Sequence, residues 1–482
     1  MTALPAPAAL HAAAGKPRRL SYRLHSLFGL KLSLFLAFIC ATGTLATLSH
    51  EIEWLLFDKV RATATAKPAD WGRMWDAAQA ARPEGWVRSL GTYDRSDADY
   101  FAKAAQVALP DGREVTLLVD PGTGEVTGEQ AGVTFHSFMR GLHYYLFTPG
   151  DWGFYLVTAL GFVLAGSILT GLLVYKRFWK GLLRRPRLQR DSRTWLGDLH
   201  RLGAVWALPF ALVIATTSIW YLLERDALQW ESEPPRGSAL RVQPDGARVD
   251  AWVRTAMAAM PGMKVTAVSL PWGDGEPVTV QGEWQAWLVR ERTNAAFIDP
   301  VSGRLLGLRA AHELPGTERW VHTADPLHFG NFGGLAGKLL WFGFGLMLTG
   351  LAMSGAIIHG KRLVSPDPLP WTRAWRSSLG QALLPSAVLI AGVPTWFYLS
   401  GWDSGSGEAM QAEGSLRADC RTVQLWRSGS RWCGAAPGTW VPNLTFVDRA
   451  GELHRAEFDA GRFCADLPAG ARPVRLAAAR AD

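Results

Sequence analysis

Four of the eleven histidines in this chain fall into two sets that share their sequence surroundings. His25 and His200 each follow a leucine just before an apolar stretch, in Leu-His-Ser-Leu-Phe-Gly and Leu-His-Arg-Leu-Gly. His143 and His328 each precede another apolar stretch. Neutral imidazoles that approach from two sides are the axial ligands of a six-coordinate haem iron. We therefore expect His25 and His200 to ligate one haem iron, and His143 and His328 a second.

Three further histidines are alternative candidates. His136 precedes His143 and His322 precedes His328, so either could ligate the iron or orient a ligand by a hydrogen bond. His359 ends the fourth apolar stretch, where the first half of the chain has Tyr175. The competing interpretation of His25 and His200 is that they are interfacial residues that bind lipid phosphate, and that of His143 and His328 is that they belong to an ordinary turn between domain and helix. The remaining histidines are interpreted as surface, interfacial or loop residues: His11, His50, His312 and His454.

Elements that could position the histidines are long apolar stretches without Asp, Glu, Lys or Arg. A helix needs about 20 such residues to cross a hydrocarbon core roughly 30 Å thick. The fifth stretch contains Pro385 and Pro394, which membrane helices tolerate better than soluble helices do. The sequence predicts five transmembrane helices, within residues 32–49, 152–175, 202–223, 339–359 and 377–402.

Positive charge is concentrated in the segments between alternate helices. Residues 1–31, 176–199 and 360–376 contain seventeen Lys and Arg but only three acidic residues. Basic loops are retained on the cytoplasmic side of a membrane. We therefore expect a bacterial inner-membrane protein with a cytoplasmic N-terminus, and the net charge of +8 gives no reason to expect a nucleic-acid partner.

The second half of the chain repeats the first at an offset of 175 to 186 residues. Each copy reads as helix, outside segment, helix. Leu169-Thr-Gly171 in the first copy matches Leu348-Thr-Gly350 in the second, and an Asp-Pro-x-x-Gly turn follows an apolar run in both outside segments, at 120–124 and 299–303. Such parallel repeats are related by a pseudo-two-fold axis along the membrane normal.

This pattern predicts eleven successive parts. They are a cytoplasmic tail (1–24), a first transmembrane helix (25–50), a first periplasmic domain (51–150), a second helix (151–175), a basic cytoplasmic loop (176–199), a third helix (200–223), a second periplasmic domain (224–335), a fourth helix (336–359), a cytoplasmic loop (360–376), a fifth helix (377–402) and a periplasmic C-terminal tail (403–482). Cys40 falls in the first helix, and one disulfide is expected among Cys420, Cys433 and Cys464 of the tail.

The chain resembles the PepSY-associated transmembrane helix family, iron-regulated inner-membrane proteins that include siderophore reductases. The two Leu-His starts, the two Asp-Pro-x-x-Gly turns and the Leu-His-Phe-Gly-Asn-Phe-Gly element at 327–333 carry the resemblance. It implies a four-helix membrane core, two periplasmic PepSY-like domains and, as in the reductase members, b-type haems held by histidines. The expected fold is a membrane all-α bundle of about five transmembrane helices, with a duplicated two-helix unit and two extracytoplasmic α+β PepSY-like domains.

The predicted function is a b-haem oxidoreductase, with two haems b, that carries electrons across the membrane to a ferric chelate such as a ferrisiderophore during iron uptake. The sequence has no Cys-x-x-Cys-His motif for c-type haem and no Gly-x-Gly-x-x-Gly motif for a nicotinamide or flavin. The electron donor is thus a quinol or a docked cytoplasmic reductase. Two alternatives stay open: a non-catalytic PepSY sensor that binds a periplasmic peptide or protease, and a siderophore transport component.

Overall fold

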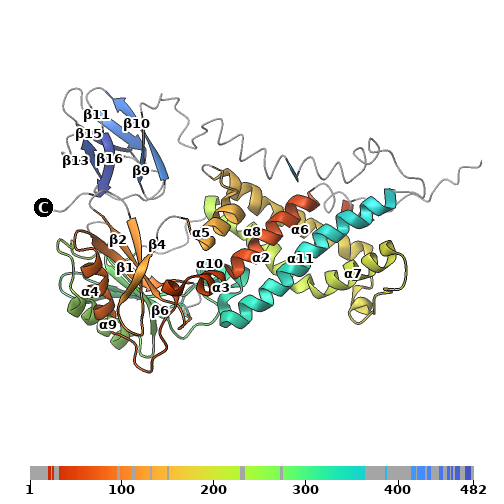
Figure 1. Ribbon diagram of the computed structural model, residues 1–482, viewed down its shortest axis with the longest axis horizontal. Coiled ribbons are helices and arrows are strands. Elements are labelled where there is room, and N and C mark those ends of the chain that lie inside the picture. The colour runs from red at the N-terminus through yellow and green to blue at the C-terminus, as the bar shows by residue number, and fades with distance from the viewer. Residues whose placement is uncertain are drawn as a thin grey trace, which may run out of the picture. The chain divides into compact units, whose positions relative to one another are not determined.

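Figure 1 shows the computed structural model of the chain, with the element labels used below. The structure describes residues 20–22, 24–25, 32–94, 98–109, 114–130, 133–148, 151–227, 234–271, 275–363 and 386–387, together with the strands between residues 414 and 478. Its contacts divide the chain into two units. The helix unit comprises Met1–Phe38, Leu160–Ala215 and Met347–Ile390, and the sheet unit comprises Ile39–Ala159, Thr216–Leu346 and Ala391–Asp482.

Two described helices are long and apolar enough to cross a membrane, α6 (Trp152–Val174) and α11 (Gly334–Leu363). Two more candidates are bent helix pairs. The pair α2 (Ser33–Thr47) and α3 (Ser49–Leu56) bends by 53°, and the pair α7 (Ser192–Trp206) and α8 (Leu208–Ala227) bends by 64°. The described part of the chain thus has two to four candidate spans, and the predicted fifth helix at 377–402 falls outside it except at residues 386–387.

The predicted third helix, 202–223, is broken where the sequence suggested one continuous span. α7 ends at Trp206, and Pro209 is the second residue of α8. A proline ring has no N–H to donate and collides with the preceding turn, so an α-helix cannot run straight through it. His200 therefore lies on α7 and not on the apolar helix α8. The Asp191 carboxylate caps the first turn of α7 by accepting the backbone N–H groups of Arg193 and Thr194, both at 3.1 Å.

Strands from residues 86–130 and 264–309 together form one antiparallel sheet of eight strands, in the order β4-β3-β2-β1-β5-β6-β7-β8. Strand β1 joins the two halves by pairing with β5, and Leu90 lies opposite Val268. The strands are β1 (Trp86–Thr92), β2 (Lys103–Ala108), β3 (Glu114–Val119), β4 (Val126–Gln130), β5 (Lys264–Ser269), β6 (Val278–Glu283), β7 (Asn294–Ile298) and β8 (Leu305–Arg309).

Helices α4 (Trp71–Ala81) and α9 (Gly246–Ala259) cover one face of this sheet side by side (Figure 1). Trp75 and Trp252 are among the largest fully buried side chains of the shared core between helices and sheet. The two helices meet at Gly72 and Gly246, where an added Cβ would collide with the facing backbone. Glycine at both positions therefore permits the close approach.

A reciprocal pair of hydrogen bonds closes this helix contact. The Asp76 carboxylate accepts the backbone N–H of Gly246 at 2.7 Å, and the Asp250 carboxylate accepts that of Gly72, also at 2.7 Å. Each helix thus satisfies one otherwise unpaired N–H at the start of the other.

The sequence suggested two separate outside domains, and the structure shows one shared sheet instead. Strand β1 would be an edge of the first half and β5 an edge of the second, and an exposed edge presents unpaired N–H and C=O groups. Pairing β1 with β5 removes both edges, and one core forms from residues of both halves, such as Val87 and Val265.

The C-terminal segment contributes strands with their own sheets, a five-stranded one in the order β14-β15-β11-β10-β9 and a three-stranded one in the order β13-β12-β16. Cys464 on β15 is disulfide-bonded, and the residue opposite it on β11 is Cys433. These strands are β9 (Gly414–Ala418), β10 (Arg421–Ser428), β11 (Arg431–Ala435), β12 (Leu444–Asp448), β13 (Leu453–Arg455), β14 (Glu457–Asp459), β15 (Arg462–Asp466) and β16 (Pro473–Ala478).

Short elements connect these parts and carry several of the histidines. They are the 3-10 turns η1 (Asp58–Val60), η3 (Phe178–Gly181) and η4 (Asn331–Gly333), the helices α5 (Phe135–Arg140) and α10 (Gly316–Phe329), and the π-helical turn η2 (Gly141–Tyr145).

Candidate functional site: two histidine pairs

In the helix unit, His25 and His200 are held by hydroxyl groups of neighbouring helices. The Nδ1 atom of His25 lies 3.2 Å from Thr170 Oγ1 and 3.2 Å from the Ser167 carbonyl oxygen, both on α6. The Nδ1 atom of His200 lies 2.8 Å from Ser354 Oγ on α11. The two rings are also close enough to interact electrostatically. The structure therefore brings together the pair that the repeat predicted, called the inner pair below because it was expected on the cytoplasmic side.

The direction of these hydrogen bonds fixes the tautomer of each ring. Thr170 Oγ1 donates its proton to the Gly166 carbonyl at 2.6 Å, and Ser354 Oγ donates its own to the Leu351 carbonyl at 3.1 Å. A hydroxyl has one proton, so each of these oxygens must accept from the imidazole N–H. Nδ1 thus carries the proton in both rings, and the lone pair is on Nε2, the atom that would bind a metal.

A glycine follows each hydroxyl residue and leaves room for the ring. A Cβ added at Gly171 would lie 3.4 Å from Cε1 of His25, and one at Gly355 would lie 3.5 Å from Cε1 of His200. Thr170-Gly171 is therefore the structural equivalent of Ser354-Gly355. Local sequence similarity instead pairs Leu169-Thr-Gly171 with Leu348-Thr-Gly350. The structure shifts the equivalent position in the second copy by five residues, because Ser354 is the residue that contacts the histidine.

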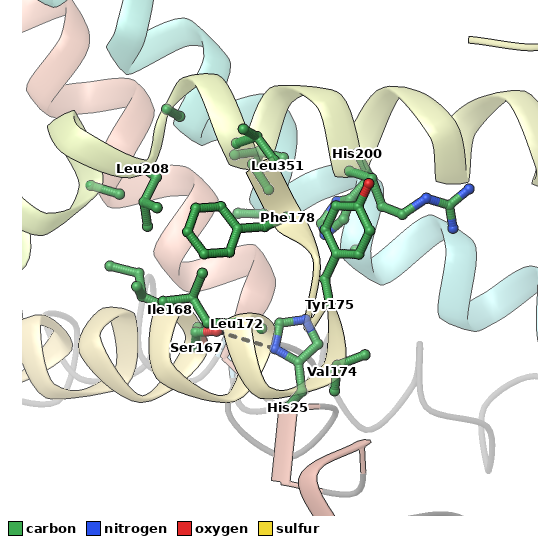
Figure 2. A pocket seen from close by; sticks show the side chains of 18 of the residues that line it. His25, Ser167, Ile168, Leu172, Val174, Tyr175, Phe178, His200, Leu208 and Leu351 are labelled. Atoms are coloured by element: carbon green, nitrogen blue, oxygen red, sulfur yellow. Dashed lines mark hydrogen bonds between the residues drawn. The ribbon is translucent and has the colours of Figure 1, made fainter. Parts of the chain in front are cut away.

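Both inner histidines line one cavity of about 620 Å³. This volume lies in the range of about 300–1,000 Å³ typical of small-molecule and cofactor pockets. In Figure 2, Tyr175 and Phe178 point into the same cavity, whose apolar wall includes Leu351. Arg184 and Arg201 line it as well and provide cationic groups. The lining combines imidazole, apolar, aromatic and cationic groups, the set that a haem with its two carboxylates requires.

In the sheet unit, His143 and His328 repeat the arrangement of the inner pair. His143 Nδ1 lies 3.2 Å from Thr42 Oγ1, and His328 Nδ1 lies 2.8 Å from Thr217 Oγ1. Thr42 also donates its hydroxyl proton to the Ile39 carbonyl at 3.0 Å, which leaves the oxygen to accept from His143. His143 and His328 interact electrostatically with each other. The second predicted pair is thus together in the structure as well, and it is called the outer pair below because it was expected on the periplasmic side.

The backbone before His143 departs from regular helix. Gly141–Tyr145 forms a π-helical turn, and a Cβ added at Gly43 would lie 2.7 Å from Cε1 of His143. His143 comes seven positions after His136, but His328 comes only six positions after His322. A π-turn accommodates one extra residue in a helix, so it absorbs this difference and keeps His143 in register with His328.

The sequence matches the family model described as the PepSY-associated TM region over residues 22–362, more than half of the chain. The chain belongs to this family. It is therefore a membrane protein, in agreement with its apolar helices. No curated protein matches the sequence of the chain. The family match covers all four histidines of the two pairs.

The other candidate histidines of this PepSY-associated TM region have different surroundings. His136 Nδ1 lies 2.7 Å from Ser49 Oγ, and its ring stacks on His50 with centroids 3.8 Å apart. His322 is fully buried in α10, and its carbonyl accepts the backbone N–H of Arg290 at 2.9 Å. His359 belongs to α11, but its side chain lies outside the described residues.

Two buried ionic clusters lie in the sheet unit, each with one cation and two carboxylates. Lys338 Nζ lies 2.7 Å from Glu51 Oε1 and 2.9 Å from Asp94 Oδ2. Arg290 lies 2.7 Å from Asp325 and 3.4 Å from Glu224. Burial disfavours the charge of Arg290, but the two carboxylates outweigh burial and raise the pKa of the guanidinium above its ordinary value.

A further polar contact lies beside His136. Glu53 is buried, accepts the backbone N–H of His136 at 2.7 Å and accepts the hydroxyl of Tyr93. Burial, followed by the hydrogen bond and charge of Glu53, raises the pKa of the Tyr93 phenol. Glu53 thus links α3 to Tyr93, the residue after β1, and to the start of α5.

Sequence reasoning did not identify the hydroxyl partners of the histidines, namely Thr42, Thr217, Thr170 and Ser354. One signal was available, because Thr42 and Thr217 are 175 residues apart, as are His25 and His200. Threonine and serine are common in membrane helices, however, and only the contacts distinguish these four from the others.

Proposed function

We propose that this chain is a membrane b-haem protein that transfers electrons between two haem sites, one held by His25 and His200 and the other by His143 and His328. The observation that carries the proposal is the shared geometry of the four imidazoles. Each has its Nδ1 on a helix hydroxyl, and this geometry directs the lone pair of Nε2 away from the hydroxyl. Ligating histidines commonly donate the second ring N–H in this way.

Each histidine pair provides only two ligands, so a metal bound there needs its other ligands from a cofactor. Among the described residues, no group of three or more His, Cys, Asp or Glu side chains is placed to hold a metal ion. Two imidazoles suffice for haem iron, because the porphyrin supplies the other four ligands. When bound, haem supplies reversible one-electron chemistry. The chain orients the two imidazoles, excludes water with apolar walls and, at the inner pair, offers Arg184 and Arg201 to the carboxylates.

The acceptor that we propose is a ferric chelate, in particular a ferrisiderophore, on the basis of the resemblance described above. Hard oxygen ligands hold ferrous iron far less tightly than ferric iron, so one added electron releases the metal. The proposed orientation places the N-terminus and the basic loop 176–199 in the bacterial cytoplasm and the eight-stranded sheet in the periplasm. The donor is then a quinol in the bilayer or a cytoplasmic reductase.

The test is a reduced-minus-oxidised absorption spectrum of the full chain purified in detergent, with haem quantified per chain. We expect b-haem bands and two haems. The double variants His25→Ala/His200→Ala and His143→Ala/His328→Ala should each lose about half of the haem. His312→Ala is the matched control, because His312 contacts Trp284 and belongs to neither pair, and it should retain both haems.

A chain that binds no b-haem would refute the proposal and leave the membrane-anchored PepSY sensor as the better interpretation. The transport alternative is tested in sealed vesicles with a labelled ferric chelate. A reductase should release ferrous iron only with a reductant present, whereas a transport component should accumulate the intact chelate without one.

A further inference from the structure

The two outer histidines are flanked by residues of opposite charge. Three residues before His143 the chain has Arg140, and three residues before His328 it has Asp325. Arg140 lies over the ring of Tyr144 at 5.1 Å, and Asp325 is buried, with 8% of its surface exposed. The two copies of the repeat therefore hold His143 and His328 in the same way, but the charged residue three positions earlier is cationic in the first copy and anionic in the second.

Asp325 is part of a cluster with an excess of negative charge. Its carboxylate receives Arg290 Nε at 2.7 Å and Arg290 Nη2 at 3.0 Å, and Glu224 Oε1 lies 3.4 Å from the same Nη2. Two carboxylates share one guanidinium, so Asp325, Arg290 and Glu224 together carry one net negative charge. We call these three residues the Arg290 cluster.

Tyr221 connects the Arg290 cluster to His328. Its hydroxyl donates to Asp325 Oδ1 at 2.9 Å, and its ring meets the His328 ring edge-on with centroids 5.3 Å apart. Asp325 also acts electrostatically on His328. A negative charge at this range, in a poorly solvated region, is only weakly screened.

We propose that the net negative charge of the Arg290 cluster lowers the reduction potential of a haem held by His143 and His328. This inference rests on the function proposed above. Oxidised haem iron carries one more positive charge than reduced iron, and a fixed negative charge nearby stabilises the more positive state. A lower potential at the outer site would favour electron transfer from this haem to a ferric chelate acceptor.

The experiment is a potentiometric titration of the haem-loaded full chain, followed at its b-haem bands. Glu224→Gln removes one negative charge and leaves the contact between Arg290 and Asp325 intact. We expect the midpoint potential of one haem to rise by about 59 mV, which is a tenfold change in the redox equilibrium of a one-electron couple. The midpoint potential of the other haem should not change. Asp325→Asn should shift the same haem further in the same direction.

Glu51→Gln is the matched control, because it removes the same charge from a different cluster, in which Lys338 lies between Glu51 and Asp94. Equal midpoints in wild type and Glu224→Gln, at unchanged haem content, would overturn the inference and leave the proposed function intact. Absence of haem from the wild-type chain would instead overturn both. Should Asp325→Asn fail to fold, Glu224→Gln alone decides.

Discussion

Ser354 accepts the Nδ1–H of His200 at 2.8 Å because its own hydroxyl proton is already bonded to the Leu351 carbonyl. One side chain of a neighbouring helix thus fixes both the tautomer and the orientation of the His200 imidazole. The same relationship holds for Thr170 with His25 and for Thr42 with His143.

The first prediction concerns this hydroxyl. Ser354→Ala should weaken haem retention at the inner site about 10- to 100-fold, the usual effect of removing the residue that orients a metal-ligating histidine. Haem retention is measured by absorbance after dilution with a haem-binding competitor. Ser354→Thr keeps a hydroxyl at the position and should behave like wild type. Equal retention by Ser354→Ala and wild type would contradict the role assigned to the hydroxyl.

The second prediction concerns the space beside His143. Gly43→Ala places a methyl group 2.7 Å from Cε1 of His143, closer than carbon atoms approach without displacement. We expect this variant to lose the outer haem and keep the inner one in the spectrum. Gly350→Ala is the control, since nothing lies within 4 Å of its added Cβ. Loss of haem from both variants alike would point to a general weakening of the helices.

The third prediction concerns the contact between α4 and α9. Asp76→Ala and Asp250→Ala each remove an acceptor from a helix N-terminal N–H, which costs about 1 kcal/mol of unfolding free energy. Thermal unfolding of the detergent-solubilised chain should show a lower midpoint for each variant. Asp70→Ala changes a residue whose side chain makes no capping hydrogen bond to α4, and it should leave the midpoint nearly unchanged. A larger effect of Asp70→Ala than of Asp76→Ala would contradict the assignment.

The fourth prediction concerns the two Asp-Pro turns. Burial tends to raise the pKa of Asp120 and Asp299, but backbone N–H groups of Thr63 and Gly122, and of Ser302 and Ser238, donate to these carboxylates. The hydrogen bonds outweigh burial, and the pKa of both groups lies below its ordinary value.

A lowered pKa in the folded state means that the charged carboxylate stabilises the fold. The stabilisation is complete above the unfolded-state pKa of about 3.9 and disappears as the pH falls through the folded-state values. Wild type should therefore lose thermal stability steeply in acid. The Asp120→Asn/Asp299→Asn variant should start lower at pH 7 and show a flatter acid limb. Parallel curves for the two proteins would rule out these carboxylates as the cause.

Several features followed directly from the sequence because they depend on local composition. The apolar lengths indicated α6 and α11, the Asp-Pro turns marked the ends of β3 and β7, and the repeat paired His25 with His200 and His143 with His328. Helix bends, in contrast, depend on where one residue interrupts a hydrogen-bond ladder. Pro209 was visible in the sequence, but its consequence for the helix that carries His200 was not foreseen.

The sequence by itself thus determined the membrane class, the duplication and the identity of the paired histidines. The tertiary structure alone decided which hydroxyl holds each imidazole, that β1 pairs with β5 so that two segments share one sheet, and that Tyr221 links His328 to Asp325. The physical reason is that the contacts that decide these features join residues about 100 or more positions apart, such as Thr42 with His143 and Tyr221 with Asp325. Their register is set by packing and strand pairing, which no local pattern of residues records.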